Sequence, residues 1–216
     1  INAQRRWIWE LLQNAKDVAF DNQQVAIEVN IQESDGQKSV SFSHNGKPFS
    51  VDDITFLIKQ VSTKERTTSA NNEKPKTTGK FGTGFLTTHL LSEKVEVYGI
   101  VKEPDLDYRS FVLPLDRSGR TSEQIIESVQ KSMTVRDTLD TQPPLLDYDP
   151  SGFNTTFKYN LDDQGYKVAK VGIEDLHSSL PFSLAFIPCI KSVTIKHENI
   201  TYELAKIENE SSNIQI

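Results

Sequence analysis

The sequence predicts an α+β fold in which a sheet is layered with helices. Apolar residues recur at helical spacing from residue 4 to 19, whereas later segments alternate apolar and polar residues as strands do. Most of these strand-like segments follow one another as neighbours, with helices gathered in a few places. This order favours an α+β layer over a parallel, doubly wound sheet, in which strands and helices alternate.

The N-terminal elements begin with a helix over residues 4–19. Residues 25–32 alternate as a strand, and a turn at 34–37 leads into a second strand over 38–46, so the two predict a hairpin. Ser50 to Asp53 can cap a short helix that continues to residue 61.

The rest of the chain continues the same mixture. Residues 62–80 are polar, without periodicity and rich in lysine, at a length typical of functional or disordered loops. Residues 116–150 read as an insertion with a helix of its own. The remaining expected elements are a helix at 85–92, strands at 94–101, 109–115 and 154–161, a helix at 173–186 and a hairpin at 190–204 that turns at 197–199.

The bulk composition is that of an ordinary globular domain. The chain has 216 residues, 36% of them hydrophobic, and can bury a good core. Its net charge of -6 argues against broad binding to nucleic acids or anionic membranes. The single cysteine, Cys189, excludes an internal disulfide and suits a reducing, cytoplasmic setting, where we expect it to pack in the core. No apolar run approaches the roughly 18 residues that span a bilayer.

The glycine-rich stretch TGKFGTGF, residues 78–85, is the first candidate for a phosphate site. Glycines let backbone amides approach an anion, and a helix that begins just after them adds a favourable dipole. The stretch does not match a P-loop, because Phe81 stands where the hydroxyl residue belongs, and its GxxGxG spacing reverses that of the dinucleotide fingerprint. A simple glycine-rich turn remains the alternative reading.

A second candidate lies on the N-terminal helix. At about 100° per residue, Glu10, Asn14 and Asp17 fall within roughly 60° of one another, beside the apolar face. A polar face in water is the alternative reading. We give more weight to a site, because this stripe occurs together with the glycine-rich stretch.

Together the two motifs resemble those of a known superfamily. ELLQNAKDVA is similar to the N-box, and GKFGTGF to the late glycine motif, of the gyrase, heat-shock chaperone, histidine kinase and MutL (GHKL) ATP-binding domains. The likeness covers about residues 5–161 and is strongest to the heat-shock-chaperone and sacsin-type branch. It implies a two-layer sandwich of the Bergerat type, with a mixed, mostly antiparallel sheet, helices on one face, and ATP held under a mobile lid.

The resemblance assigns roles to matching residues. It implies that Glu10 is the general base that orients water, that Asn14 is the ligand of Mg²⁺, and that Asp17 lies near the base and ribose of ATP. Ser62 and Lys64 match the edge of the lid. The phosphates are expected to bind the glycine motif, which comprises Gly79, Lys80, Phe81, Gly82, Thr83, Gly84 and Phe85.

One motif departs from the family pattern. The family's DxGxG aspartate, which accepts a hydrogen bond from the adenine amino group, is replaced by His44, while Gly46 matches the first glycine. His44 either reads adenine through an accepting nitrogen or is a packing residue. Phe49 is either a wall of the base pocket or a core aromatic. The threonine behind the adenine is matched best by Thr155, with Thr156 as the alternative.

The resemblance implies a domain of a larger polypeptide in which Mg-ATP binding drives conformational change or homodimerisation, in a chaperone-like or defence-associated setting. We expect ATP hydrolysis; the alternative is a nucleotide-sensing module without turnover. A histidine kinase core is disfavoured, because no phosphoacceptor helix precedes the motif. Residues 1–161 would form the ATP-binding domain, and residues 162–216 an extension that packs on it or begins a second domain. Neither membrane nor direct nucleic-acid partners are expected.

Overall fold

The computed structural model describes residues 3–21, 23–62 and 83–204. The strands are β1 (Val25–Ser34), β2 (Gln37–His44), β3 (Lys94–Glu103), β4 (Leu106–Asp116), β5 (Thr155–Leu161), β6 (Ile190–Ile195) and β7 (Ile200–Glu203). The α-helices are α1 (Ala3–Asp17), α2 (Val51–Ser62), α3 (Ser122–Asp137) and α4 (Asp163–Ser183). The 3₁₀ helices are η2 (Thr83–Leu90), η3 (Leu139–Thr141), η4 (Leu184–Phe186) and η5 (Lys196–Glu198).

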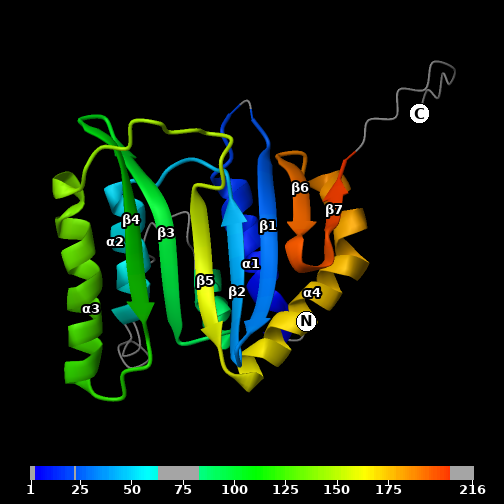
Figure 1. Ribbon diagram of the computed structural model, residues 1–216, viewed down its shortest axis with the longest axis horizontal. Coiled ribbons are helices and arrows are strands. Elements are labelled where there is room, and N and C mark those ends of the chain that lie inside the picture. Colours follow the sequence, from blue (N-terminus) through cyan, green and yellow to red (C-terminus); the bar gives the residue numbers. More distant parts are fainter. Residues whose placement is uncertain (1–2, 22, 63–82, 205–216) are drawn as a thin grey trace, which may run out of the picture.

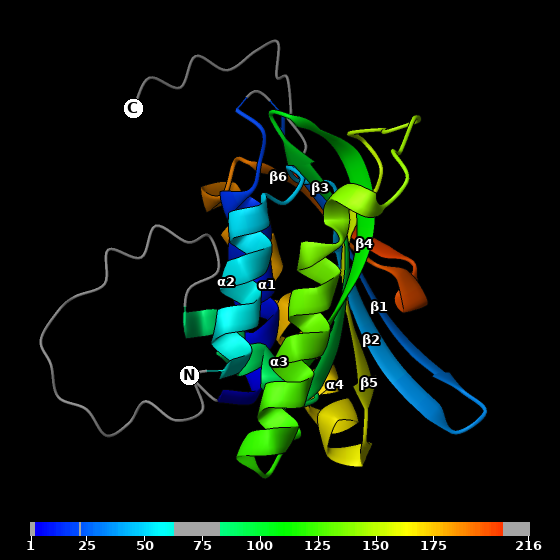
Figure 2. The same cartoon turned by 90° about the vertical axis from the view of Figure 1, so that its left-hand side faces the viewer.

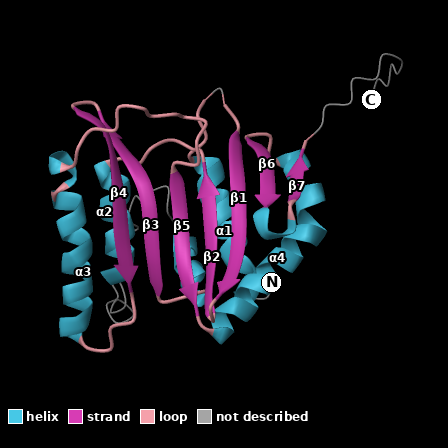
Figure 3. Cartoon of the chain, viewed as in Figure 1, coloured by secondary structure: helices cyan, strands magenta, loops and turns pink. Residues whose placement is uncertain are grey.

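Within the described ranges, seven strands form one mixed sheet in the order β4-β3-β5-β2-β1-β6-β7 (Figure 1). Strands β1 and β6 are parallel, and the other neighbouring pairs are antiparallel. The prediction of an α+β fold with a mostly antiparallel sheet is therefore confirmed. Figure 3 shows that β5, which is distant from β2 in the sequence, lies beside it in the middle of the sheet.

The helices are layered against one face of this sheet. Figure 2 shows α1, α2 and α3 on one side, while the β1–β2 hairpin is uncovered by helices on the other. The alternating burial of β1 explains this arrangement, because Val25, Ile27, Val29 and Ile31 point into the core while the residues between them are partly exposed.

The predicted β1–β2 hairpin and the predicted cap of α2 are both present. Asp35 and Gly36 have φ values of 52° and 76°, the left-handed conformation that a two-residue hairpin turn requires. At the start of α2, the Ser50 hydroxyl accepts from Asp53 N–H at 3.1 Å, and Asp53 Oδ2 accepts from Ser50 N–H at 2.9 Å. This reciprocal cap stabilises the helix start by about 1 kcal/mol.

The segment after the glycine-rich stretch differs from the prediction of an ordinary helix over 85–92. It forms the 3₁₀ helix η2, which begins at Thr83. The Thr87 hydroxyl donates to Gly84 O, and the Thr88 hydroxyl to Phe85 O, each at 2.7 Å. These bonds to the residue three positions back compete with the four-residue spacing of an α-helix.

The C-terminal segment is packed onto the same core. Helix α4 begins ten residues before the predicted helix at 173–186, where Asp162 accepts from Gly165 N–H at 2.7 Å. The buried Trp7 indole donates to Val168 O at 3.2 Å, and β6 pairs with β1 in the sheet. Cys189, expected in the core, is only half-buried. Among the described residues, no helix combines the length and apolar character that a bilayer crossing needs.

Candidate functional site

Two members of the predicted stripe, Glu10 and Asn14, lie along the inner side of α1, whereas the third, Asp17, is exposed. Glu10, Asn14 and Val18 follow one another at intervals of four residues, so their side chains lie one above the other. Asn14 and Val18 are only 6% exposed, while Glu10 is half-buried. The stripe begins next to η2 and ends next to the loop after β2, as the contacts below show.

At the first end of the stripe, Glu10 meets the glycine-rich segment. A Cβ atom built on Gly84 would overlap the carboxylate of Glu10, so only glycine lets η2 come this close to the acid. Arg6 Nη2 lies 3.3 Å from Glu10 Oε1, one turn earlier on α1. The Glu10 side chain retains 20% of its exposure, so water can reach the carboxylate.

In the middle of the stripe, Asn14 has an unsatisfied amide. Its Nδ2 atom is fully buried and has no hydrogen-bond partner in the described part of the chain. Leaving such a group unpaired costs roughly 1–3 kcal/mol, and each instance in a folded protein calls for an explanation. An amide held ready for a bound ligand is one such explanation.

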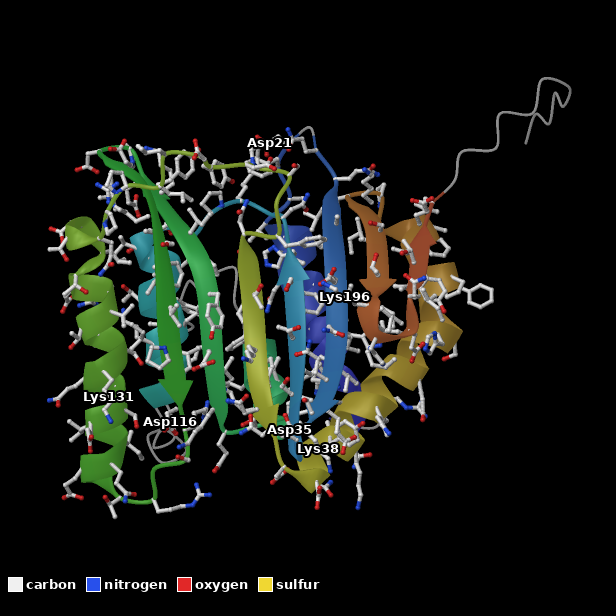
Figure 4. The ribbon with its side chains drawn as sticks, in the orientation of Figure 1. Asp21, Asp35, Lys38, Asp116, Lys131 and Lys196 are labelled. Atoms are coloured by element: carbon white, nitrogen blue, oxygen red, sulfur yellow. The ribbon has the colours of Figure 1, made fainter. Side chains whose placement is uncertain are left out.

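At the far end of the stripe, α1 meets the loop that follows β2. Val18 O accepts from Lys47 N–H at 2.8 Å, and a Cβ on Gly46 would crowd Val18 Cγ2. Lys47 Nζ also binds Asp21 at 2.9 Å, just beyond the helix. Figure 4 labels Asp21 at this end of the sheet, opposite Lys38 at the other end.

His44, the last residue of β2, lies on the inner face of the sheet at the same end. It is 3% exposed, and burial lowers the pKa of its imidazole to about 3. Gly46 N–H donates to His44 Nδ1 at 3.1 Å. In the sheet His44 pairs with Thr155 of β5, whose side chain is also buried on the inner face.

Phe157 joins the two ends of the site. Its ring centroid lies 5.6 Å from that of Phe85 in η2 and 6.4 Å from that of His44. Phe157 is fully buried in β5, two residues after Thr155, so both point to the same face. The three rings therefore form a continuous wall between Gly84 and His44.

The structure separates some candidates from this cluster. Phe49 stacks edge-on against Phe111 at 5.3 Å, over Gly99, and so has the contacts of a core aromatic. Asp17 is exposed, with Lys16 at 3.8 Å. The Thr156 hydroxyl bonds with Ser43 Oγ at 2.8 Å on the opposite face of the sheet from Thr155.

Several predicted residues lie outside the described residues. They are Lys64, Gly79, Lys80, Phe81 and Gly82. Ser62 ends α2 and Thr83 begins η2, but only their backbones are described. The site defined above is therefore formed by α1, the start of η2, and the adjoining ends of β2 and β5.

Two members of the cluster were not predicted from the sequence. Arg6 stands four residues before Glu10, a spacing at which an ion pair on a helix is expected. Phe157 occupies an apolar position in the alternating strand NTTFKYNL, a pattern that indicates burial without distinguishing a site wall from general core. Phe157 could be assigned to the site only from the pairing of β5 with β2, which brings Phe157 beside His44.

A separate pocket of about 470 Å³ is lined by residues of β3, β4 and η3, Phe111 among them. Tyr98, Val112, Leu139 and Asn154 contribute to its lining, and no charged side chain does. None of the predicted site residues lines it, so it is distinct from the cluster on α1.

Comparison of the sequence with protein-family models and with curated proteins found no match. In the fold, Glu10 and Asn14 of the first motif share one side of α1, and Glu10 packs against Gly84 of the second motif.

Proposed function

We propose that this chain is an ATP-binding domain of the GHKL type, with a Bergerat fold, that binds Mg-ATP along the α1 stripe and hydrolyses it. The observation that carries the proposal is the packing of the Glu10 carboxylate against Gly84. It joins the two motifs, which are more than seventy residues apart in the sequence, at one point in space. The proposal extends to a role within a larger polypeptide, chaperone-like or defence-associated, whose conformation or dimerisation follows the nucleotide state.

The residues present fit a magnesium ion held jointly with phosphates. Within residues 3–21, 23–62 and 83–204, no group of three or more His, Cys, Asp or Glu side chains is arranged to hold a metal ion. A site that depends on phosphate oxygens needs few protein ligands, since Mg²⁺ is usually held by one or two side chains plus substrate phosphates and water. Asn14 would supply such a ligand through its amide oxygen, while its unpaired Nδ2 group would donate to a phosphate oxygen. When bound, the ion would neutralise charge on the phosphates.

Glu10 is the residue suited to activate water. A carboxylate accepts a proton at Oε and orients the attacking water by hydrogen bonding. Arg6 at 3.3 Å holds one oxygen of Glu10 and restricts the rotamers of the acid. Because Gly84 has no side chain, the carboxylate of Glu10 packs directly against the backbone of η2. The backbone amides at the start of η2 then lie beside the acid, where phosphates would bind.

The other end of the stripe is suited to the nucleoside. His44 and Thr155 offer polar groups side by side on the inner face of the sheet, and Phe157 offers an apolar wall. A few convergent polar groups on an apolar surface are typical of a site that binds a base. In this arrangement Phe49 belongs to the core behind the site.

The test combines calorimetry with phosphate release. ATP and ADP should bind with a dependence on Mg²⁺, and Glu10→Gln should retain ATP binding while phosphate release falls by about 10²–10⁴-fold, the usual contribution of a general base. Glu127→Gln is the matched control, because Glu127 is an exposed carboxylate on α3 that, among the described residues, pairs only with Lys131. Wild-type turnover in Glu10→Gln would show that another group is the base, and failure of ATP and ADP to bind would defeat the proposal.

A nucleotide-sensing module without turnover is the second candidate. The observation that favours it is the ion pair between Arg6 and Glu10, which occupies the carboxylate that hydrolysis needs. Under this alternative, ATP binds as tightly as in the first proposal, but phosphate release in the wild type equals that of Glu10→Gln.

A further inference from the structure

The tautomer of His44 follows from its hydrogen bond to the backbone. The Gly46 N–H group points at Nδ1 at 3.1 Å, and a backbone N–H can only donate. Nδ1 therefore carries a lone pair. In a neutral imidazole the other nitrogen then carries the proton, so Nε2–H is a donor.

The environment of the ring keeps it in this neutral form. His44 is surrounded by the aromatic rings of Phe42 and Phe157, whose centroids are both 6.4 Å away. This burial without a facing carboxylate lowers the pKa of the imidazole to about 3. At neutral pH the ring is uncharged, and Nε2 cannot act as an acceptor while Nδ1 is bonded to Gly46.

The Nε2–H group is available to a ligand. No described residue accepts a hydrogen bond from it, although the side chain is almost completely covered. Nε2 lies at the far edge of the ring from Cβ, on the face of the sheet that α1 covers. Its neighbour across the strands is Thr155, whose hydroxyl can both donate and accept.

We propose that His44 donates Nε2–H to an acceptor at the 6-position of a purine, so that the site takes 6-oxopurine nucleotides at least as well as ATP. This inference rests on the proposed function, in which His44 stands where the family aspartate accepts from the adenine amino group. If adenine bound with its 6-amino group at His44, that amino group and Nε2–H, which are both donors, would face each other. A 6-oxopurine such as hypoxanthine or guanine presents a carbonyl oxygen instead, which accepts the His44 proton.

The matched probe is inosine triphosphate, because hypoxanthine differs from adenine at the 6-position and the adjacent N1 proton. Calorimetry with Mg²⁺ should show that wild-type protein binds ITP at least as tightly as ATP. His44→Asp restores an acceptor and should shift the ratio of affinities towards ATP at least tenfold, or about 1.4 kcal/mol. Ser43→Ala, on the same strand with its side chain on the opposite face, should leave the ratio unchanged.

The outcomes separate this inference from the proposed function. If both nucleotides bind and wild-type protein prefers ATP tenfold or more, the base is read through another atom and the inference is wrong, while the proposed function stands. An unchanged ratio in a folded His44→Asp variant also overturns it. If neither nucleotide binds, the proposed function fails and the inference fails with it.

A second measurement needs no substitution at a buried position. Nitrogen-15 NMR of the histidine rings distinguishes the two neutral tautomers. The His44 signals should show a protonated Nε2 and an unprotonated Nδ1 at neutral pH, and the Nε2 signal should shift when ITP is added. A protonated Nδ1 would refute the donor assignment even if the His44→Asp variant does not fold.

Discussion

Replacing Gly84 with alanine tests the contact on which the proposed function depends. The new Cβ would overlap the Glu10 carboxylate, which is the far end of a flexible, half-buried side chain. Gly84 does not have a positive φ, so alanine fits its backbone conformation. The overlap is relieved when Glu10 moves, and the carboxylate must retreat by more than about 1 Å to reach an ordinary contact distance.

The expected change in stability is small and the expected change in turnover is large. Alanine in a helical segment gains roughly 0.5–1 kcal/mol over glycine, and loss of the exposed Arg6–Glu10 pair costs about 0–1 kcal/mol. The free energy of unfolding should therefore change by less than about 1 kcal/mol. A displacement of a catalytic group by about 1 Å costs roughly 10²-fold in rate, so phosphate release should fall by about that factor.

The assay compares Gly84→Ala with Gly172→Ala, the same substitution at a structural position. A Cβ at Gly172 in α4 would meet the fully buried Trp7 indole, which cannot move aside. Gly172→Ala should lower the free energy of unfolding in urea by about 1–3 kcal/mol while the folded fraction keeps its turnover. Wild-type turnover in Gly84→Ala, or destabilisation as large as that of Gly172→Ala, would refute the reasoning.

Two further predictions concern buried polar groups of the site. Asn14→Ala removes an amide whose Nδ2 is buried and unpaired among the described residues, so urea denaturation should show a free energy of unfolding within about 1 kcal/mol of wild type. Calorimetry should show loss of Mg²⁺-dependent ATP binding. A decrease of about 2 kcal/mol or more in the free energy of unfolding would indicate a structural hydrogen bond instead. For His44, the folded pKa of about 3 lies below the unfolded value of about 6.5, so its contribution to stability is present above pH 6.5 and is lost as pH falls towards 3. Wild type should lose up to about 1.4 kcal/mol per pH unit more than His44→Gln across that window, and parallel stability curves for the two proteins would contradict this.

The sequence predicted the elements whose patterns are local. The spacing of Glu10 and Asn14 placed both on one stripe of α1, and the alternation in β1 and β2 predicted the hairpin. These features depend on the periods of helix and strand, which a single sequence displays.

The features that the sequence did not predict depend on tertiary contacts, which leave no periodic pattern in the sequence. The beginning of α4 was missed because Gly165 and Gly172 are poor helix formers, yet both allow close packing, against Leu91 O and the Trp7 indole. The 3₁₀ form of η2 was missed because it depends on threonine hydroxyls bonding to the backbone. Choosing between Thr155 and Thr156 as the residue that faces the site required knowledge of how β5 pairs with β2.

The two ends of the site are held at a fixed distance by one rigid element. Glu10 lies on α1 and Val18 directly follows the helix, eight residues later, or about 12 Å along the axis at 1.5 Å per residue. Gly84 packs against Glu10, and Gly46 packs against Val18. The same helix and the residue that follows it therefore position both the start of η2 and the loop after β2. The opposite side of α1 is fixed to α4 through the hydrogen bond from the Trp7 indole to Val168 O. A change at His44 should therefore alter which base is accepted without moving Glu10, and a change at Gly84 should alter turnover without changing which base is preferred.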